Sequence, residues 1–269
     1  SSSRREISHF LDGLVTEGAL SYGEIVKSAN YCNIPLYSPY ICALISFTEQ
    51  NRLLQTSEWL GTSALLRSQL ADKWEMLSGN ISYAFAKYNN VILVLQQSES
   101  LPVYEQVALV REYCGDLMKM LSAKGQDRGV IFGIGDPVPS LAEFCRSYSQ
   151  ALRTVDLASR ICDERIATYR RYILCELIYD SPNAKLALIQ RIKPLLAYDE
   201  EHNTQLLYTL ETYFNNCQNS VKTSKALFIH RNTLLYRLDR IAEILDLNYN
   251  DSEQMLTFQL ALKAFLMCQ

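Results

Sequence analysis

Histidine, paired cysteines and long apolar runs are scarce or absent in this 269-residue sequence. The only histidines are His9, His202 and His230, and their wide separation argues against a histidine-rich metal site. No apolar run approaches the roughly 20 residues of a membrane-spanning helix, and no secretory signal opens the chain. We therefore expect a cytoplasmic protein that uses no metal, no cofactor and no membrane.

Eight cysteines are present, but none are spaced as a CxxC pair, so no disulfide or zinc motif is evident. We interpret them as reduced thiols of the core or its boundary. Hydrophobic residues make up 48% and charged residues 20%, which is typical of a globular protein and excludes a disordered chain. The length allows one large domain or two modest ones. The opening Ser1-Ser2-Ser3 resembles a cut linker, so we expect that part of the natural protein lies upstream.

Strand-like and helix-like segments alternate through the first two thirds of the chain. Residues 40–47 and 129–135 have the length and apolarity of strands, and two strand-like runs around Asn89-Asn90 predict a β-hairpin. Amphipathic stretches predict helices over residues 58–77, 103–125 and 140–160. This order predicts an α+β or α/β layer, with helices packed on a sheet.

Local signals mark some of the boundaries. Ser21 precedes Glu24 by three residues, which is the spacing of a capping box, and Ser140 precedes Glu143 in the same way. Residues 166–178, IATYRRYILCELI, fit either a last strand or a strand that runs into a helix. Residues 199–203, DEEHN, resemble a short linker, and everything after Thr204 has a helical pattern.

Residues 228–241, FIHRNTLLYRLDRI, concentrate arginine in a chain whose formal net charge is -3. Five lysines or arginines and one aspartate lie between Asn219 and Ile241, a local difference of +4. Asn219 or Ser220 can cap a short helix, and a second helix is predicted from about Arg231 to Leu245. The inward face of this second helix consists of Leu234, Leu238, Ile241 and Leu245. Asn232, Tyr236, Asp239, Arg240 and Glu243 lie opposite, with Thr233 and Arg237 on the flanks.

A second helix after a tight turn is the element that the major groove of DNA accepts. At its first turn, Arg231 can pair with guanine, Asn232 with adenine, and Thr233 with a thymine methyl or a phosphate. Each good base contact contributes roughly 1–3 kcal/mol of discrimination. The phosphate contacts expected from this pattern are Lys222, Lys225, Arg237 and Arg240.

Each of these residues also has a plainer interpretation. A helix with an apolar stripe and arginines outside is usually a solvated helix, and the stem of Arg237 can simply lie along the core edge. Tyr236 can touch phosphate or pack on a neighbouring helix. His230 stands where an N-cap is expected, although histidine is a mediocre cap, and it can contact phosphate or be an ordinary surface residue. Phe228 stands where many helix-turn-helix units have glycine, so we expect a different or longer turn, with its ring packed between the two helices.

The last 60 residues resemble the C-terminal helix-turn-helix domain of the PucR/CdaR family of bacterial transcriptional regulators. The motifs that carry the resemblance are LETYF, HRNTLLYRL and FQLALKA, in this order. Upstream, the segments ALISF, YNNVILVL, GVIFGIG and YRRYILCELI follow the order of the family's GGDEF-like middle domain. The resemblance implies control of catabolic genes in response to a small-molecule effector, often by activation.

The hairpin that should carry a diguanylate cyclase signature reads KYNNVILVL, without the glycine pair or the carboxylates. Metal-dependent phosphoryl transfer needs oxygen ligands at that place, so we expect no cyclase activity and no enzyme. The glycines of GIGD resemble a phosphate loop only weakly, because the full spacing and the lysine are missing. The alternatives are a nucleotide-binding or residual phosphotransfer protein, and an adaptor whose helix-turn-helix no longer reads DNA.

The fold expected is α+β: a degenerate, ferredoxin-like GGDEF domain followed by an all-α helix-turn-helix domain. The domain layout expected is an N-terminal helical segment at 1–38, a GGDEF-like sensory or dimerisation domain at 39–180, a connecting helix and linker at 181–203, and the DNA-binding domain at 204–269. The partners expected are double-stranded DNA and further copies of the chain, as a homodimer or higher even oligomer. The DNA-binding residues expected are Lys222, Thr223, Lys225, His230, Arg231, Asn232, Thr233, Tyr236, Arg237 and Arg240.

Overall fold

The computed structural model describes residues 2–47, 70, 73–161 and 164–267. The chain divides into two compact units, Ser1–Ile173 and Leu174–Gln269, which are described one by one. The helix expected over residues 58–77 falls largely outside the described residues, although residues 73–78 are helical.

The first unit is built on a five-stranded sheet in the order β2-β3-β1-β4-β5. Neighbouring strands are antiparallel except for β4 and β5, which are parallel. The strands are β1 (Tyr40–Phe47), β2 (Ser82–Lys87), β3 (Asn90–Gln96), β4 (Val130–Ile134) and β5 (Ile166–Thr168). This mixed sheet, followed by an all-helical second unit, confirms the α+β prediction.

The predicted hairpin forms, but its turn lies one residue earlier than expected. Lys87 pairs with Asn90, so the two turn residues are Tyr88 and Asn89, and Asn90 is the first residue of β3. Tyr88 takes the positive φ of the turn, at 52°. Asparagine content therefore located the hairpin but did not identify which residue would take the left-handed conformation.

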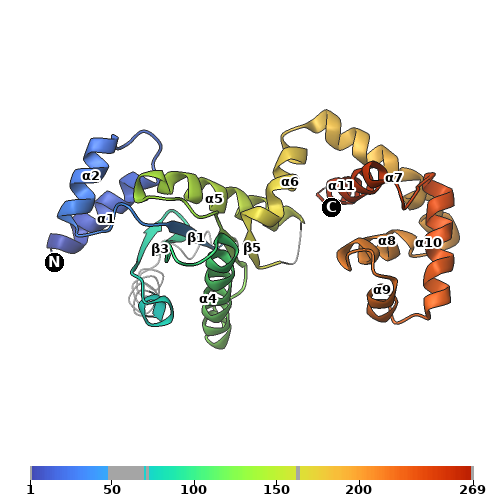
Figure 1. The fold of residues 1–269 in the computed structure, drawn as a ribbon, viewed down its shortest axis with the longest axis horizontal. Coiled ribbons are helices and arrows are strands. Elements are labelled where there is room, and N and C mark those ends of the chain that lie inside the picture. The colour runs from blue at the N-terminus through green and yellow to red at the C-terminus, as the bar shows by residue number, and fades with distance from the viewer. Residues whose placement is uncertain (1, 48–69, 71–72, 162–163, 268–269) are drawn as a thin grey trace. The chain divides into compact units, whose positions relative to one another are not determined.

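Helices cover both faces of the sheet (Figure 1). β1 is buried on both sides, and its alternation sends Cys42 and Leu44 into one core and Ile41 and Ala43 into the other. Helix α4 (Val103–Ala123) packs in the core that contains Ile41. The opposite core contains α1 (Ser2–Leu14), α2 (Tyr22–Tyr31) and α5 (Phe144–Ile161).

Glycines in β4 and directly after it allow α5 to approach the sheet closely. A Cβ on Gly133 would lie 2.3 Å from the carbonyl oxygen of Ala151, and one on Gly135 would lie 2.1 Å from that of Ser147. The hydroxyl of Ser147 also accepts a hydrogen bond from the backbone N–H of Cys42, at 2.9 Å. The two glycines therefore allow α5 to pack directly against the strand. This packing accounts for glycine at both positions, and no phosphate-binding loop is needed to explain them.

One of the two predicted capping boxes forms and the other does not. Ser21 and Glu24 form the capping box at the start of α2, and Gly125 takes a φ of +66° just after α4. Ser140 makes no side-chain cap, because a short 3-10 helix (η1, Leu141–Glu143) intervenes before α5 begins. Residues 166–178 form a short strand that runs into a helix, the second of the two alternatives.

Helix α6 (Tyr169–Tyr179) crosses from the first unit into the second. The second unit then contains α7 (Pro182–His202), α8 (Leu206–Asn215), α9 (Ser220–Ala226), α10 (Arg231–Leu245) and α11 (Ser252–Leu266). Its core joins apolar residues of α7, α8, α10 and α11.

The prediction of a linker at residues 199–203 was wrong, because α7 continues to His202. The carboxylate of Asp199 accepts hydrogen bonds from the backbone N–H groups of Leu206 and Leu207, at 2.8 and 2.9 Å. The last turn of α7 therefore caps the start of α8. Polar residues that resemble a linker in the sequence here satisfy the free donors of the next helix.

Candidate nucleic-acid interface

Helices α9 and α10 form the helix-turn-helix pair that the sequence predicts. Asn219 is the N-cap of α9, and its side-chain oxygen accepts from the N–H groups of Val221 and Lys222, both at 3.0 Å. Helix α10 begins at Arg231 and ends at Leu245, as expected. The four residues of its predicted inward face, Leu234, Leu238, Ile241 and Leu245, are all buried in the core of the second unit.

The turn between the two helices is a compact left-handed cap centred on Phe228, whose φ is 55°. The N–H of Phe228 donates to the carbonyl of Lys225, and that of Ile229 donates to the carbonyl of Ser224, at 3.2 and 3.0 Å. This pair of bonds is a Schellman motif, in which glycine is the usual left-handed residue. For a residue with a Cβ, the left-handed conformation costs roughly 1–2 kcal/mol.

The prediction for the ring of Phe228 was wrong. Phe228 is 94% exposed, while its neighbours Leu227 and Ile229 pack against the core of the second unit. The turn is also no longer than usual, because Phe228 itself adopts the conformation that glycine would supply. The left-handed backbone directs the two flanking side chains inward and leaves the phenyl ring in solvent.

The first turn of α10 presents Arg231, Asn232 and Thr233, all three exposed. Their side chains make no hydrogen bond or ion pair to any other described residue. His230 is the N-cap of the helix, and its Nδ1 accepts from the N–H of Asn232 at 3.2 Å. The ring therefore caps the start of the helix at the position where the sequence predicts an N-cap, although histidine is a mediocre cap.

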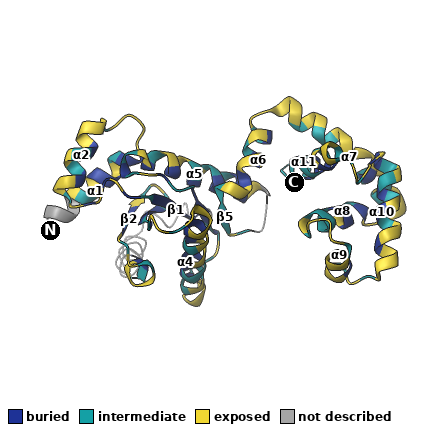
Figure 2. Ribbon diagram, in the orientation of Figure 1, coloured by how far each residue is buried: buried dark blue, intermediate teal, exposed yellow. Residues whose placement is uncertain are grey.

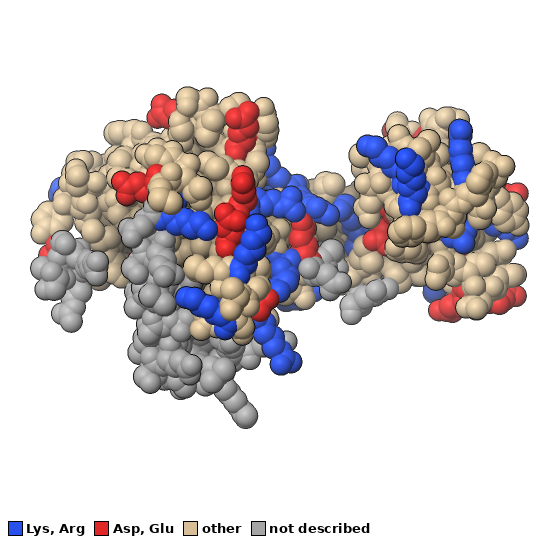
Figure 3. Space-filling model, turned by 90° about the horizontal axis from the view of Figure 1, so that it is seen from below, with Lys and Arg blue, Asp and Glu red and all other residues tan. Residues whose placement is uncertain are grey.

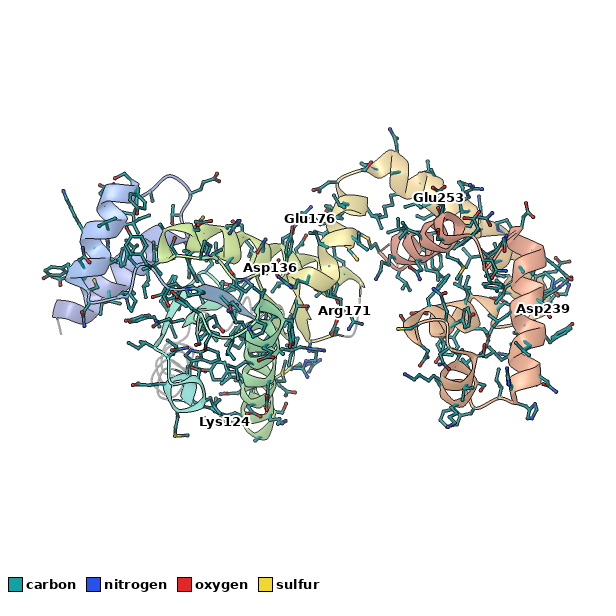
Figure 4. The ribbon with its side chains drawn as sticks, viewed as in Figure 1. Lys124, Asp136, Arg171, Glu176, Asp239 and Glu253 are labelled. Atoms are coloured by element: carbon teal, nitrogen blue, oxygen red, sulfur yellow. The ribbon has the colours of Figure 1, made fainter. Side chains whose placement is uncertain are left out.

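Tyr236 follows one turn later and is 72% exposed, so it does not pack on a neighbouring helix. Leu235 beside it is also exposed. Leu235 was not among the residues expected at the surface of α10, although its position outside the leucine seam indicated that it would be exposed. Figure 2 shows exposed positions along the outer side of α10, and Figure 4 labels Asp239 on that side.

Two of the arginines expected on phosphate are held by other helices of the second unit. Arg237 is half-buried, and its Nη1 donates to Oγ1 of Thr209 on α8 at 3.1 Å. The guanidinium of Arg240 lies 5.0 Å from the ring centre of Tyr198 on α7 and donates from Nε to its hydroxyl at 3.2 Å. Hydrogen bonds to Tyr198 and then to Glu243 raise the pKa of Arg240 above its ordinary value.

Lys222 and Lys225 on α9 are exposed and form no ion pair with a described residue, as a phosphate contact requires. Thr223, between them, is fully buried, and its hydroxyl donates to the carbonyl of Asn219 at 2.8 Å. Burial excludes Thr223 from a surface contact, so we remove it from the interface. In Figure 3, basic side chains project from the second unit, with acidic ones nearer its margins.

The first unit offers no comparable site among its described residues. The β2–β3 turn, Tyr88 and Asn89, supplies a hydroxyl and an amide but no carboxylate. In the described part of the chain, no group of three or more histidine, cysteine, aspartate or glutamate residues could hold a metal ion. The six cysteines in the described part of the chain, four in the first unit and two in the second, are free thiols. No described helix is both long and apolar enough to cross a membrane.

Family models match both units. The GGDEF-like domain matches residues 17–157, more than half of the chain, and the PucR C-terminal helix-turn-helix domain matches residues 206–264. The chain thus joins a GGDEF-like sheet domain, here without the cyclase signature, to a helix-turn-helix domain. It belongs to the PucR/CdaR family of bacterial transcriptional regulators.

Curated relatives extend this assignment. The chain is 27% identical to the proline-responsive transcriptional activator PutR of Bacillus subtilis (strain 168), over 65% of this chain and 43% of that protein. It is 24% identical to the purine catabolism regulatory protein of the same organism, over 97% of this chain and 49% of the relative. It is 30% identical to the carbohydrate diacid regulator of Escherichia coli (strain K12), over 48% and 34%. The chain spans less than half the length of each of these relatives.

Proposed function

We propose that this chain is a sequence-specific DNA-binding transcriptional regulator. The observation that carries the proposal is the exposed tip formed by Arg231, Asn232 and Thr233, whose side chains have no partner among the described residues. Arginine and asparagine can each form two hydrogen bonds to one base, with guanine and adenine respectively. Unoccupied donors at the start of a helix that is packed on α7 and α8 support a role in reading base edges.

The surroundings of this tip support contact with the phosphate backbone. Lys222 and Lys225 are exposed on α9, the helix that precedes α10. The first N–H groups of α10 favour a negatively charged partner. We assign register-setting phosphate contacts to these two lysines. Arg237 and Arg240 instead hold α10 against α8 and α7, so their contribution to binding is indirect.

The relatives suggest what is regulated. The name of the first relative describes a response to proline, and the names of the other two refer to purine catabolism and to a carbohydrate diacid. We infer that this chain likewise controls catabolic genes in response to a small metabolite. The first unit then serves sensing or dimerisation rather than phosphoryl transfer, which its β2–β3 turn does not support, since Tyr88 and Asn89 offer no carboxylate for a metal ion.

A single recognition helix covers few base pairs, so we infer that the active form is a homodimer or a higher even oligomer. Two copies of α10 would then read half-sites roughly 34 Å apart, one turn of the duplex. The operator is expected to be a palindrome or a near-palindrome, because a twofold protein reads the same sequence on both strands.

Selection of genomic fragments on the purified chain tests the proposal and identifies the operator. A selected duplex should bind with an affinity that falls steeply as the salt concentration rises. The double variant Arg231→Ala, Asn232→Ala should keep its fold and lose its preference for the operator over random DNA. The pair Lys222→Ala, Lys225→Ala is the matched control, because it should weaken both kinds of DNA alike. Unchanged preference in the first variant would remove Arg231 and Asn232 from the reading role.

A further inference from the structure

Phe228 has the highest exposed fraction, 94%, among the large hydrophobic residues that the structure describes as exposed. The turn that it occupies is closed by backbone hydrogen bonds to Lys225 and Ser224, which any residue tolerant of positive φ could make. Glycine would form the same turn with less strain, and asparagine tolerates this conformation better than phenylalanine. Neither the turn nor the core therefore accounts for a phenyl ring at this position.

The ring stands within the basic region of the second unit. The backbone carbonyl of Lys225 accepts a hydrogen bond from the backbone N–H of Phe228. Arg231, at the tip of α10, follows Phe228 by three residues. Five lysines or arginines and a single aspartate lie between Asn219 and Ile241. A protein surface that covered this ring would have to desolvate or neutralise the surrounding cations, whereas DNA presents phosphates for the cations beside apolar C–H groups for the ring.

We propose that Phe228 is a DNA-contacting residue whose ring packs on an apolar part of the duplex, next to the bases that Arg231 and Asn232 read. This inference rests on the proposed function. Two chemical groups of the duplex fit the ring: the C5-methyl group of a thymine in the major groove, and the C–H face of a deoxyribose at the groove edge. Both are apolar, so the contact releases no counterions.

This lack of counterion release separates the proposed contact from a phosphate contact. Removing the ring should weaken binding by the same factor at every salt concentration, without changing the slope of log affinity against log salt. Removing Lys222 should instead make that slope shallower by about 1. The two kinds of contact are therefore distinguishable in a single salt titration, although both lie on the same surface.

The test compares Phe228→Gly and Phe228→Asn with the unmodified chain on a selected operator and on random duplex, across a range of salt concentrations. Both substitutions suit the left-handed turn, so the melting temperature should stay equal or rise. Affinity should fall by roughly tenfold for each half-site, with an unchanged salt slope. Leu256→Asn is the matched control, because Leu256 is exposed on α11, which is not part of the helix-turn-helix pair.

A second set of duplexes distinguishes the two apolar groups. Each thymine of the operator is replaced in turn by deoxyuridine, which lacks the methyl group. If the ring covers a methyl, one such replacement weakens the unmodified chain and has no further effect on Phe228→Gly. If it covers a deoxyribose, no replacement shows this pattern, while the loss from the protein substitution remains.

Equal affinity of both variants and the unmodified chain for the operator would overturn the inference and leave the proposed function intact. A loss of affinity accompanied by dissociation of the oligomer, measured by sedimentation, would also overturn it, because the ring would then serve contacts between copies. Failure of the unmodified chain to bind any selected duplex would instead reject the proposed function itself.

Discussion

Nη1 of Arg237 on α10 lies 3.1 Å from Oγ1 of Thr209 on α8, a fully buried residue, and donates a hydrogen bond to it. The same hydroxyl donates to the carbonyl of Gln205 at 2.8 Å, so it acts as donor and acceptor together. An arginine that the sequence places on the flank of the recognition helix is thereby tied to the neighbouring helix. This contact therefore holds α10 against α8. The guanidinium of Arg237 is engaged there and does not serve as a phosphate contact.

Arg237→Ala should lower the free energy of unfolding of the second unit by about 1–2 kcal/mol, because Thr209 loses a charged donor. The salt slope of DNA binding should not change. Thermal unfolding and a salt titration of binding measure the two effects. Lys222→Ala should give the opposite pattern, with unchanged stability and a slope shallower by about 1. A shallower slope for Arg237→Ala at full stability would return this residue to the phosphate contacts.

His230→Ala should destabilise the start of α10 by about 1 kcal/mol, because the N–H of Asn232 loses its acceptor. His230→Asn should retain the stability, since asparagine is among the preferred N-cap residues. Amide hydrogen exchange of Asn232 and its neighbours reports the fraying directly. Equal exchange in the alanine and asparagine variants would show that the imidazole does not act as the cap.

Gly135→Ala should destabilise the first unit by about 3 kcal/mol or more, because the new Cβ would meet the backbone of α5 rather than a side chain that could move. Gly23→Ala is the control: it lies in α2 with no atom near the added Cβ, and should be neutral or stabilising by up to about 1 kcal/mol. Trp74 is buried in the first unit, and the sequence of the second unit contains no tryptophan, so tryptophan fluorescence follows the unfolding of the first unit in denaturant. Equal midpoints for the two variants would contradict the close approach of α5.

The stability of the first unit should fall in acid partly through Asp127. Hydrogen bonds from Ser122 and then from Arg165 lower the pKa of this carboxyl below its ordinary value of 3.8. Folding therefore favours the ionised form, so the stabilisation is complete above the ordinary pKa and is lost as the pH falls through the lower, folded-state pKa. Between about pH 6 and about pH 3, the denaturant concentration at the midpoint of unfolding should fall less for Asp127→Asn than for the unmodified chain.

Glu99→Gln, on an exposed turn, is the control for this measurement and should lose as much of its midpoint in acid as the unmodified chain does. If Asp127→Asn behaves like this control, the two hydrogen bonds do not couple Asp127 to folding. The comparison isolates one carboxyl among many that titrate over the same range.

Periodicity predicted much of what the structure contains. The spacing of Leu234, Leu238, Ile241 and Leu245 gave the inward face of α10, because a helix repeats every 3.6 residues whatever packs against it. Short apolar runs located β1, β3 and β4 within one or two residues. The hairpin was found as well, although its turn fell on Tyr88 and Asn89 and not on the two asparagines.

Burial and partners on other helices were not predictable in this way. Thr223 lies in the middle of a polar stretch, yet it is fully buried. Tyr198, the partner of Arg240, is 42 residues away in the sequence. Neither fact follows from local pattern, since each depends on which helix of the second unit comes to lie beside α9 or α10.

The sequence by itself determined the order of strands and helices, the apolar seam of α10 and the local excess of positive charge, because propensity, period and charge are local properties. Only the tertiary structure decided which of the basic residues are free to meet DNA. Lys222, Lys225 and Arg231 remain without a partner among the described residues, whereas Arg237 and Arg240 are held by α8 and α7. It also turned Phe228 outward, because a left-handed residue in a Schellman turn sends its flanking side chains into the core and its own into solvent.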